Sequence, residues 1–412
     1  MGLAFLLINT LLLAVYLVLR RGEVLAFLLF FQQIHWLLFS ELDLVEFRTP
    51  YFLIVFAGFL LALLASQLRY SKLSKGLLNF PTLSLLLFYL IMGYYLISGN
   101  VPTDRGGDII SSFLIQVTPL FVLIALLISN KKTIAEVANG ILVFGLLYFL
   151  ILVIMVDFAS FAVEDRMAIR ELYSINPIGI SRVFGMVFIV AFLYLINTKK
   201  LYSIAGLSLQ MTASGYILIL GASRGPIIAV FISLLTYILL KSDNIGTLLK
   251  GLMVTVLVVL VSLFFASQYS FGILDRFYEL SNYESMGRYT RFQMAAGILS
   301  NPDVWLFGLG TDGFDHLTDM NYPHNIIIEM LVEYGILGIL SLLILLAYGA
   351  YCCNYLIKEN TDTSLHFLPV IFIYLVFNAM VSGNIFANRM LWILAILMST
   401  AIYTLKKDNA GK

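Results

Sequence analysis

Long apolar segments follow one another along the whole chain and are separated by short polar breaks. Each segment is close to the ~20 residues that a helix needs to cross about 30 Å of hydrocarbon. Charged residues make up only 12% of the 412 residues, about half of the roughly 25% that is typical of soluble domains. Backbone groups in lipid need internal hydrogen bonds, and the segments lack the alternating pattern of barrel strands, so helices are the expected structure.

The predicted fold is an all-α polytopic membrane protein that forms one integral membrane domain over residues 1–412. A large extracytoplasmic loop containing short helices is expected at 267–323. Cys352 and Cys353 are adjacent, so the pair offers neither a disulfide nor a metal-binding framework. Thirteen membrane helices are expected, at about 3–19, 24–39, 51–68, 77–97, 109–129, 134–157, 177–197, 201–220, 226–240, 249–266, 336–357, 366–382 and 390–405.

Basic residues are divided unevenly between the two sets of loops. When the helices alternate across the membrane, fifteen lysines and arginines fall on one side with six acids, and ten arginines fall on the other with eighteen acids. The positive-inside rule assigns the first side to the cytoplasm, which puts the C-terminus inside and the N-terminus outside. All twelve lysines are then cytoplasmic, and every external cation is an arginine.

The preference for arginine on the external side suggests a ligand. Arginine presents a planar fork that grips phosphate or carboxylate through paired hydrogen bonds. Each external arginine has two interpretations, an ion pair with one of the external acids or a contact with substrate. For the set as a whole, we favour a phosphate-bearing substrate.

Two candidate arginines lie beside proline- and glycine-containing turns. Arg182 follows Pro177 at the start of a helix, which places it near the external mouth, facing the bundle or the lipid headgroups. Arg224 lies in a turn between Gly221 and Pro226, where we expect the backbone to approach a ligand closely and Pro226 to start the next helix. The alternatives are snorkelling to lipid phosphate for Arg182 and an ordinary turn for Arg224.

The large loop carries a further pair of arginines. Residues 285–299 predict an amphipathic helix with Arg288 and Arg291 one turn apart on one face. Salt bridges to Glu279 or Glu284 are the alternative to substrate binding for this pair. Met294, Ile298 and Leu299 are expected to serve packing only.

A histidine lies at the end of this loop, in residues 321–325. We expect a helix whose first turn holds Pro323 and His324, where free amides and the helix dipole attract phosphate oxygens. His324 is a candidate acid, base or phosphate-binding donor, with a structural hydrogen bond as the alternative. Asn325 is a candidate substrate-binding residue.

This helix cannot run straight into the membrane. A continuous helix from His324 to Ile357 would extend over ~51 Å, which is too long for the bilayer alone. We therefore expect an external or re-entrant helix, carrying Glu329 and Glu333, and a break near Gly335 or Gly338.

Several function classes have no sequence support. The chain contains no HExxH, Walker, DxD or clustered-cysteine motif, so no metal or cofactor is predicted. It also lacks the basic patch of a nucleic-acid-binding protein.

The order of these motifs resembles the membrane glycan polymerase and ligase superfamily, which comprises Wzy-type O-antigen or capsule polymerases and O-antigen ligases. The resemblance covers residues 176–345 in its motifs and the whole chain in topology. It depends on Ser-Arg-Gly at Ser223, Gly-Arg at Gly287, Gly-x-Gly at Gly308 and Pro-His-Asn at Pro323.

The resemblance implies a metal-independent, C-type glycosyltransferase in the bacterial cytoplasmic membrane, with an extracytoplasmic active site. Its donor and acceptor would be undecaprenyl diphosphate-linked oligosaccharides, and its protein partners a chain-length regulator and a flippase. Arg182, Arg224 and the Arg288/Arg291 pair match the family's external arginines and would hold the diphosphate. His324 matches the histidine of the late loop and would stabilise the leaving group or deprotonate the acceptor hydroxyl.

Polymerase is the favoured reaction, and two alternatives remain. The ligase signature places His-Asn nine residues before Gly-x-x-Gly and two threonines, whereas Ile339 and Leu340 follow Gly335 and Gly338 here. A ligase would transfer the finished glycan to a lipid A-core acceptor. A transporter of lipid-linked glycan would place polar groups at the middle of the membrane, often in paired halves, and this chain concentrates its charge at the outer face instead.

Overall fold

The computed structural model describes residues 22, 23, 26, 80–98, 105–111, 113–114, 117–118, 131–155, 177–221, 223–242, 246, 249, 287–359 and 363–410. These ranges contain helices and connecting turns, and no strand. Seven of the described helices are long and apolar enough to cross a membrane. The prediction of an all-α polytopic membrane protein is therefore confirmed.

The long helices follow the predicted apolar segments closely. The predicted bounds 177–197 and 201–220 are those of α10 and α11, and the other described spans differ by a few residues at most, apart from the start of α18. The expected helices at 3–19, 24–39, 51–68, 109–129 and 249–266 lie wholly or partly outside the described residues. The long described helices are α5 (Phe80–Ser98), α7 (Lys131–Met155), α10 (Pro177–Asn197), α11 (Leu201–Leu220), α12 (Arg224–Lys241), α18 (Ile326–Asn354), α19 (Phe367–Val381) and α20 (Met390–Ala410).

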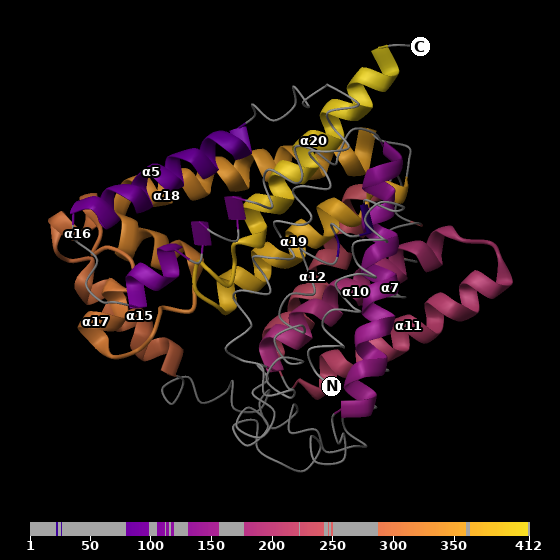
Figure 1. Cartoon of the computed structure of the whole chain (residues 1–412), viewed down its shortest axis with the longest axis horizontal. Coiled ribbons are helices and arrows are strands. Elements are labelled where there is room, and N and C mark those ends of the chain that lie inside the picture. The colour runs from indigo at the N-terminus through magenta and orange to yellow at the C-terminus, as the bar shows by residue number, and fades with distance from the viewer. Residues whose placement is uncertain are drawn as a thin grey trace, which may run out of the picture.

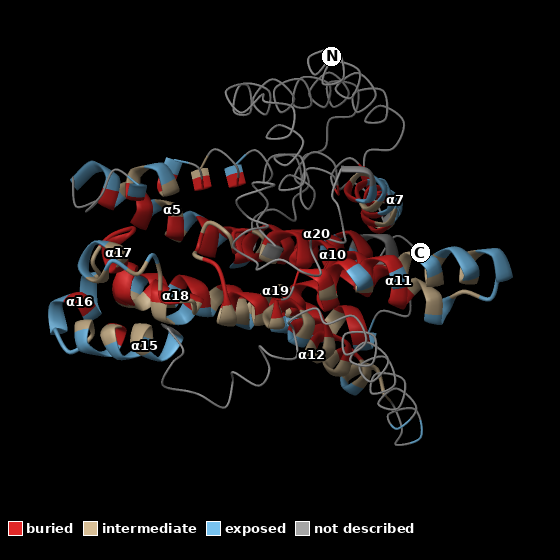
Figure 2. Cartoon of the chain, turned by 90° about the horizontal axis from the view of Figure 1, so that it is seen from below, coloured by how far each residue is buried: buried red, intermediate tan, exposed pale blue. Residues whose placement is uncertain are grey.

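Helix α10 lies at the centre of the described bundle, against α7, α11, α12 and α19 (Figure 1). Its side chains are mostly buried, as are those of α20 (Figure 2). Glycines allow the close approach: a Cβ atom on Gly185 would lie 2.3 Å from the Tyr374 hydroxyl oxygen. Small residues at helix contacts are the usual means of packing in membranes, where the hydrophobic effect does not hold helices together.

Helices α5 and α18 pack side by side in opposite directions (Figure 1). Phe80 contacts Tyr348 at one end of the pair, with ring centroids 5.5 Å apart, and Tyr95 lies 6.0 Å from Tyr334 near the other. Between these contacts, the Ser84 hydroxyl donates to the Ser341 carbonyl at 2.7 Å and the Ser341 hydroxyl donates to the Ser84 carbonyl at 2.9 Å.

Three short helices cover the beginning of α18: α15 (Gly287–Ile298), α16 (Pro302–Phe307) and α17 (Gly313–Thr318) (Figure 1). The amphipathic helix predicted at 285–299 is thus confirmed, with its start two residues later. Its apolar side chains pack around Ala295, Phe314 and Val332, and the predicted packing residues Met294, Ile298 and Leu299 belong to this cluster.

Helix α18 is kinked at Gly335, as expected from its length. The backbone there has φ 60° and ψ −154°, a conformation that is essentially restricted to glycine. A kink frees backbone carbonyl groups, and the turn after α16 supplies their donors: Leu309 N donates to Val332 O and Gly310 N donates to Glu333 O, both at 2.9 Å. The loop and the broken helix therefore form one hydrogen-bonded unit.

The two ends of the described bundle differ in charge. Lys200, Lys241, Lys358 and Lys406 lie near the ends of long helices that point one way. The starts of α10, α12 and α18, together with α15, carry the arginines and the histidine predicted for the site. The fold therefore brings the candidate site residues to a single end.

Candidate functional site

The charges of Arg224 and Arg291 both act on Arg288, and we call these three residues the arginine cluster. Arg288 and Arg291 project from α15, and Arg224 is the first residue of α12. Partial exclusion of water by the surrounding protein lowers the pKa of the Arg288 guanidinium, and the charges of Arg224 and Arg291 lower it further. Two segments that are far apart in the sequence thus place their guanidinium groups close enough to interact.

The turn before α12 sets the position of Arg224. Helix α12 begins at Arg224, two residues before Pro226, the predicted first residue. A Cβ atom on Gly225 would lie 3.0 Å from the Val381 side chain at the end of α19. The Ser-Arg-Gly sequence therefore combines a cation at a helix start with a glycine that permits close packing against α19.

Arg291 connects the cluster to the loop that carries the histidine. Its Nε atom donates to the Met320 carbonyl oxygen at 3.2 Å. Two residues further on, burial raises the pKa of the Tyr322 hydroxyl, and nearby charges modulate it. Those charges are Arg182, Arg291 and Arg105, which lower it, and Glu329, which raises it. Tyr322 thus lies among several charges at this end of the bundle, although no sequence motif had selected it.

His324 lies outside the helix, and the expected helix start was wrong. Helix α18 begins at Ile326 with Asn325 as its N-cap, so Pro323 and His324 precede it. His324 has a left-handed backbone with φ 61°, and its ring centroid lies 4.5 Å from that of Tyr322 in an edge-to-face contact. The physical reason is capping: the Asn325 side chain satisfies two free amides, which a proline at the first helical position does not do.

Asn325 uses both ends of its amide group. Its Oδ1 atom accepts from Ile327 N at 3.0 Å and Ile328 N at 3.2 Å, and its Nδ2 atom donates to the Met380 carbonyl at 3.3 Å. It therefore fixes the start of α18 to the end of α19. Substrate binding by Asn325 remains a prediction.

Arg182 is enclosed by the bundle, with 8% of its surface exposed, so of its two predicted orientations the structure selects the one facing the bundle. Its Nη2 atom donates to Ser382 O at 2.6 Å and Asn378 O at 3.3 Å, and its Nη1 atom to Ala387 O at 3.5 Å. These carbonyls belong to the end of α19 and the turn to α20. Arg182 thereby compensates the negative end of α19. Binding of a diphosphate by Arg182 remains a prediction.

Buried carboxyl groups lie on α18 and at the start of α17. Glu329 is 1% exposed, and its Oε1 atom accepts from Ile385 N at 2.8 Å. Glu333 and Asp312 are also buried. The apolar sequence around Glu329 and Glu333 had suggested no role for them, and only their i, i+4 spacing on α18 signals that they share a face. Within the described ranges, no group of three His, Cys, Asp or Glu side chains is arranged to hold a metal ion.

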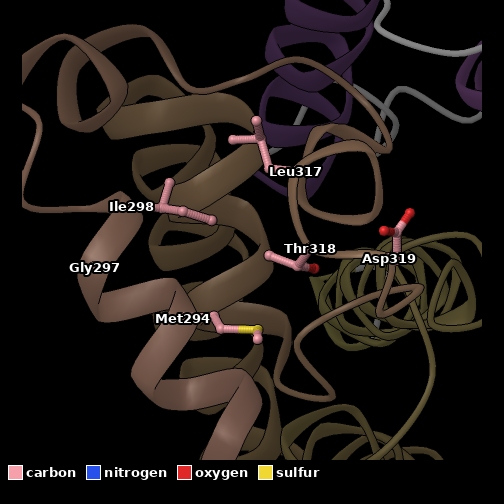
Figure 3. Close-up of a pocket in the computed structure, with 6 residues that line it drawn as sticks. All are labelled: Met294, Gly297, Ile298, Leu317, Thr318 and Asp319. Atoms are coloured by element: carbon pink, nitrogen blue, oxygen red, sulfur yellow. The ribbon is translucent and has the colours of Figure 1, made fainter.

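An open groove of about 430 Å³ lies between α15 and α17 (Figure 3). Met294, Gly297 and Ile298 line it from α15, and Leu317, Thr318 and Asp319 line it from the α17 side. Met294 is three residues beyond Arg291, so the groove continues away from the arginine cluster along α15.

Comparison with known protein families gives a match to part of the chain. No curated protein matches the chain. Residues 209–343 match a family model described as O-antigen ligase, and this range contains Arg224, Arg288, Arg291 and His324. Members of that family are glycan-transferring enzymes. The match covers 135 of the 412 residues, and over this range the chain is similar to the O-antigen ligase and polymerase superfamily.

Proposed function

We propose that the protein polymerises undecaprenyl diphosphate-linked oligosaccharide repeat units into a surface polysaccharide, O-antigen or capsule. The observation that carries this proposal is the arginine cluster beside Tyr322 and His324. Cations that repel one another gain most from a multivalent anion between them, and a diphosphate provides two adjacent anionic groups.

The reaction joins two lipid-linked glycans. The acceptor hydroxyl oxygen attacks the anomeric carbon of the donor chain, a glycosidic bond forms, and the bond from that carbon to the diphosphate oxygen breaks. Negative charge accumulates on the departing polyprenyl diphosphate. Arg224 and Arg288 stabilise that charge with donors that are in position before the reaction, which is an effective form of electrostatic catalysis.

His324 has two roles compatible with its position. As a base, it would take the proton of the acceptor hydroxyl; as a donor, it would bind a phosphate oxygen of the leaving group. Its left-handed backbone and its edge-to-face contact with Tyr322 fix the ring direction in either case. Arg291 and Asn325 are proposed to assist in binding, and Arg182 in shaping the end of α19 near the diphosphate.

The proposed orientation puts this end of the bundle on the extracytoplasmic face of the bacterial inner membrane. The lysine-rich end then faces the cytoplasm, in keeping with the positive-inside rule. Lipid-linked donor and acceptor would both reach the site from the outer leaflet, and a flippase would deliver them there.

A ligase is the second candidate, because the matching family model carries the description O-antigen ligase. A ligase uses the same donor chemistry and differs in its acceptor, a lipid A-core. The residues after Gly338 are Ile339 and Leu340, where the ligase signature has threonines, and this difference favours the polymerase.

Deleting the gene and separating the surface glycans on a gel distinguishes the candidates. We expect a polymerase phenotype, in which the ladder is lost while a single repeat unit remains attached. Loss of all attached glycan, with long chains accumulating on the carrier lipid, would identify a ligase. Repeat units trapped on the inner leaflet would identify a flippase and overturn the proposal.

The variant Arg224→Lys, expressed in the deletion strain, tests whether the arginine fork binds the diphosphate. Lysine keeps the charge and loses the planar fork, so the variant should be made at normal levels and fail to restore the ladder. Lys200→Arg, a reciprocal exchange at the opposite end of the bundle, serves as the matched control and should restore it. A fully active Arg224→Lys protein would remove the argument for bidentate diphosphate binding.

A further inference from the structure

We infer that Arg105 is a positioning residue that holds the His324 loop in its active shape. We define this loop as residues 312–325. The inference deepens the proposed function and rests on it, because the loop presents His324 to the reaction.

The His324 loop has a strained backbone. Among the described residues, Asp312, Asp319, Asn321 and His324 are the ones other than glycine that have a positive φ, from 54° to 67°. Left-handed conformations are unfavourable for residues with a side chain, although Asp, Asn and His tolerate them best. Four of them in one short loop persist only where surrounding groups over-determine the conformation.

Arg105 supplies such a restraint from another part of the chain. Its Nη1 atom donates to Asp315 Oδ2 and, at 3.2 Å, to Asn321 Oδ1. Its Nε atom lies 3.7 Å from Asp312 Oδ1. One guanidinium group therefore contacts three side chains of the loop, two of which belong to residues with left-handed backbones.

Asp315 extends the contact with Arg105 to the backbone of the loop. The second oxygen of Asp315, Oδ1, accepts from the backbone amide of Asn321 at 2.5 Å. The Asp315 carboxylate thus bridges Arg105 and the backbone immediately before Tyr322. Asn321 is held twice, once through its side chain and once through its amide, three residues before His324.

Arg105 is itself anchored to the bundle. It is the first described residue of a helical segment in which Ile110, Phe113 and Val117 are buried. The Phe113 ring lies 5.4 Å from Phe88 of α5 and 5.9 Å from Trp392 of α20. Because its segment is packed against two long helices, Arg105 is a fixed point against which the loop can be held.

The side chain is chemically suited to this position. Arg105 is 43% exposed, whereas Asp312 is 3% and Asp315 22% exposed at the side chain. The buried carboxylate of Asp312 and the partly exposed carboxylate of Asp315 thus share the solvent-accessible guanidinium of Arg105. Its rigid planar fork holds five N–H donors in fixed directions, whereas the ammonium group of lysine is a compact point charge with three donors.

Hydrogen exchange of the loop and steady-state kinetics together test the inference, with full-length protein in lipid nanodiscs. In Arg105→Gln, amide exchange in residues 312–325 should accelerate about tenfold relative to residues 326–334, a local loss of about 1.4 kcal/mol. kcat should fall by as much as about 100-fold, the effect of misplacing a reacting group, while KM for the lipid-linked donor changes little because the arginine cluster is intact.

Four further variants make the result specific. Asp315→Asn should reproduce both effects in part, and Arg105→Gln combined with Asp315→Asn should be less severe than the sum of the two single changes. Arg105→Lys should recover part of kcat. Asp108→Asn removes a charge from an exposed side chain one turn further along the same segment and should change neither measurement.

The outcomes separate this inference from the proposed function. Unchanged exchange in Arg105→Gln would overturn the restraint, and faster exchange with an unchanged kcat would overturn the positioning role. If faster exchange is accompanied by a loss of activity that His324→Ala does not share, the loop is held by Arg105 but the role proposed for His324 is wrong.

Discussion

The Arg182 site and the arginine cluster show two different uses of the same side chain at one end of the bundle. Around Arg182, the carbonyls of Asn378, Ser382 and Ala387, at the end of α19 and in the turn to α20, accept from the guanidinium. Around Arg288, the neighbouring charges are those of Arg224 and Arg291, which repel it. The hydrogen bonds from Arg182 to these carbonyls stabilise the fold. The neighbouring charges of the arginine cluster create a positive electrostatic potential that favours the binding of an anion.

The largest expected effect follows from Arg288. In Arg288→Gln, polymerisation by purified protein in nanodiscs should slow by about 10²–10³-fold, the usual cost of removing one preorganised donor to a developing anion. The apparent Tm should stay unchanged or rise slightly, because a repulsive charge is removed. Lys241→Gln, at the opposite end of α12, is the control for charge and should be fully active. A large drop in Tm for Arg288→Gln would show that the cluster has a structural role instead.

Arg182 should show the reverse pattern. In Arg182→Met, buried carbonyls lose a charged donor, and we expect a destabilisation of about 3 kcal/mol. The apparent Tm of the protein in nanodiscs, followed by intrinsic fluorescence, should therefore fall by several degrees. A variant with unchanged Tm and no activity would instead favour the diphosphate role predicted from the sequence.

Gly335 tests whether activity depends on the strained backbone at the kink of α18. Gly335→Ala should destabilise the kink by about 1–3 kcal/mol, the cost of a conformation reserved for glycine. The added Cβ would also lie 2.4 Å from the Leu306 carbonyl oxygen. Activity and Tm should both fall. The control is Gly206→Ala in α11, where the added atom meets nothing within 4 Å; it should be as stable as the parent or slightly more stable.

The sequence predicts the long helices well because their length and end residues are local properties. α10 begins at a proline and ends before two lysines, and its bounds are those predicted. The break at Gly335 also follows from length alone. The start of α18 was wrong because two local signals compete, Pro323 as a first helical residue and Asn325 as a cap, and the cap prevails.

The partners of the arginines are not local. Arg182 contacts carbonyls that are 196 to 205 positions away, and Arg105 contacts Asp315 across 210 positions. No spacing rule relates such residues, so the sequence identifies arginine as the external cation without separating the enclosed from the clustered ones. The same holds for Tyr322, whose importance arises from the charges that surround it.

Asn325 lies between the two regions and gives the smallest expected effect. Its side chain caps α18 beside His324, and its Nδ2 atom reaches Met380 at the end of α19. Asn325→Ala removes both contacts and should lower stability by about 1 kcal/mol, the typical value of an N-cap. Asn325→Asp keeps the cap, adds a favourable charge at a helix start and loses only the donor to Met380.

The pair of variants separates capping from substrate binding. If Asn325 only caps the helix, Asn325→Asp should keep the parent Tm and most of the activity, and Asn325→Ala should lose a little of each. If Asn325 also donates to the diphosphate, the carboxylate of Asn325→Asp repels the substrate, so KM for the lipid-linked donor rises while Tm is unchanged. The second pattern would show that the substrate-binding site extends from the arginine cluster to the first turn of α18.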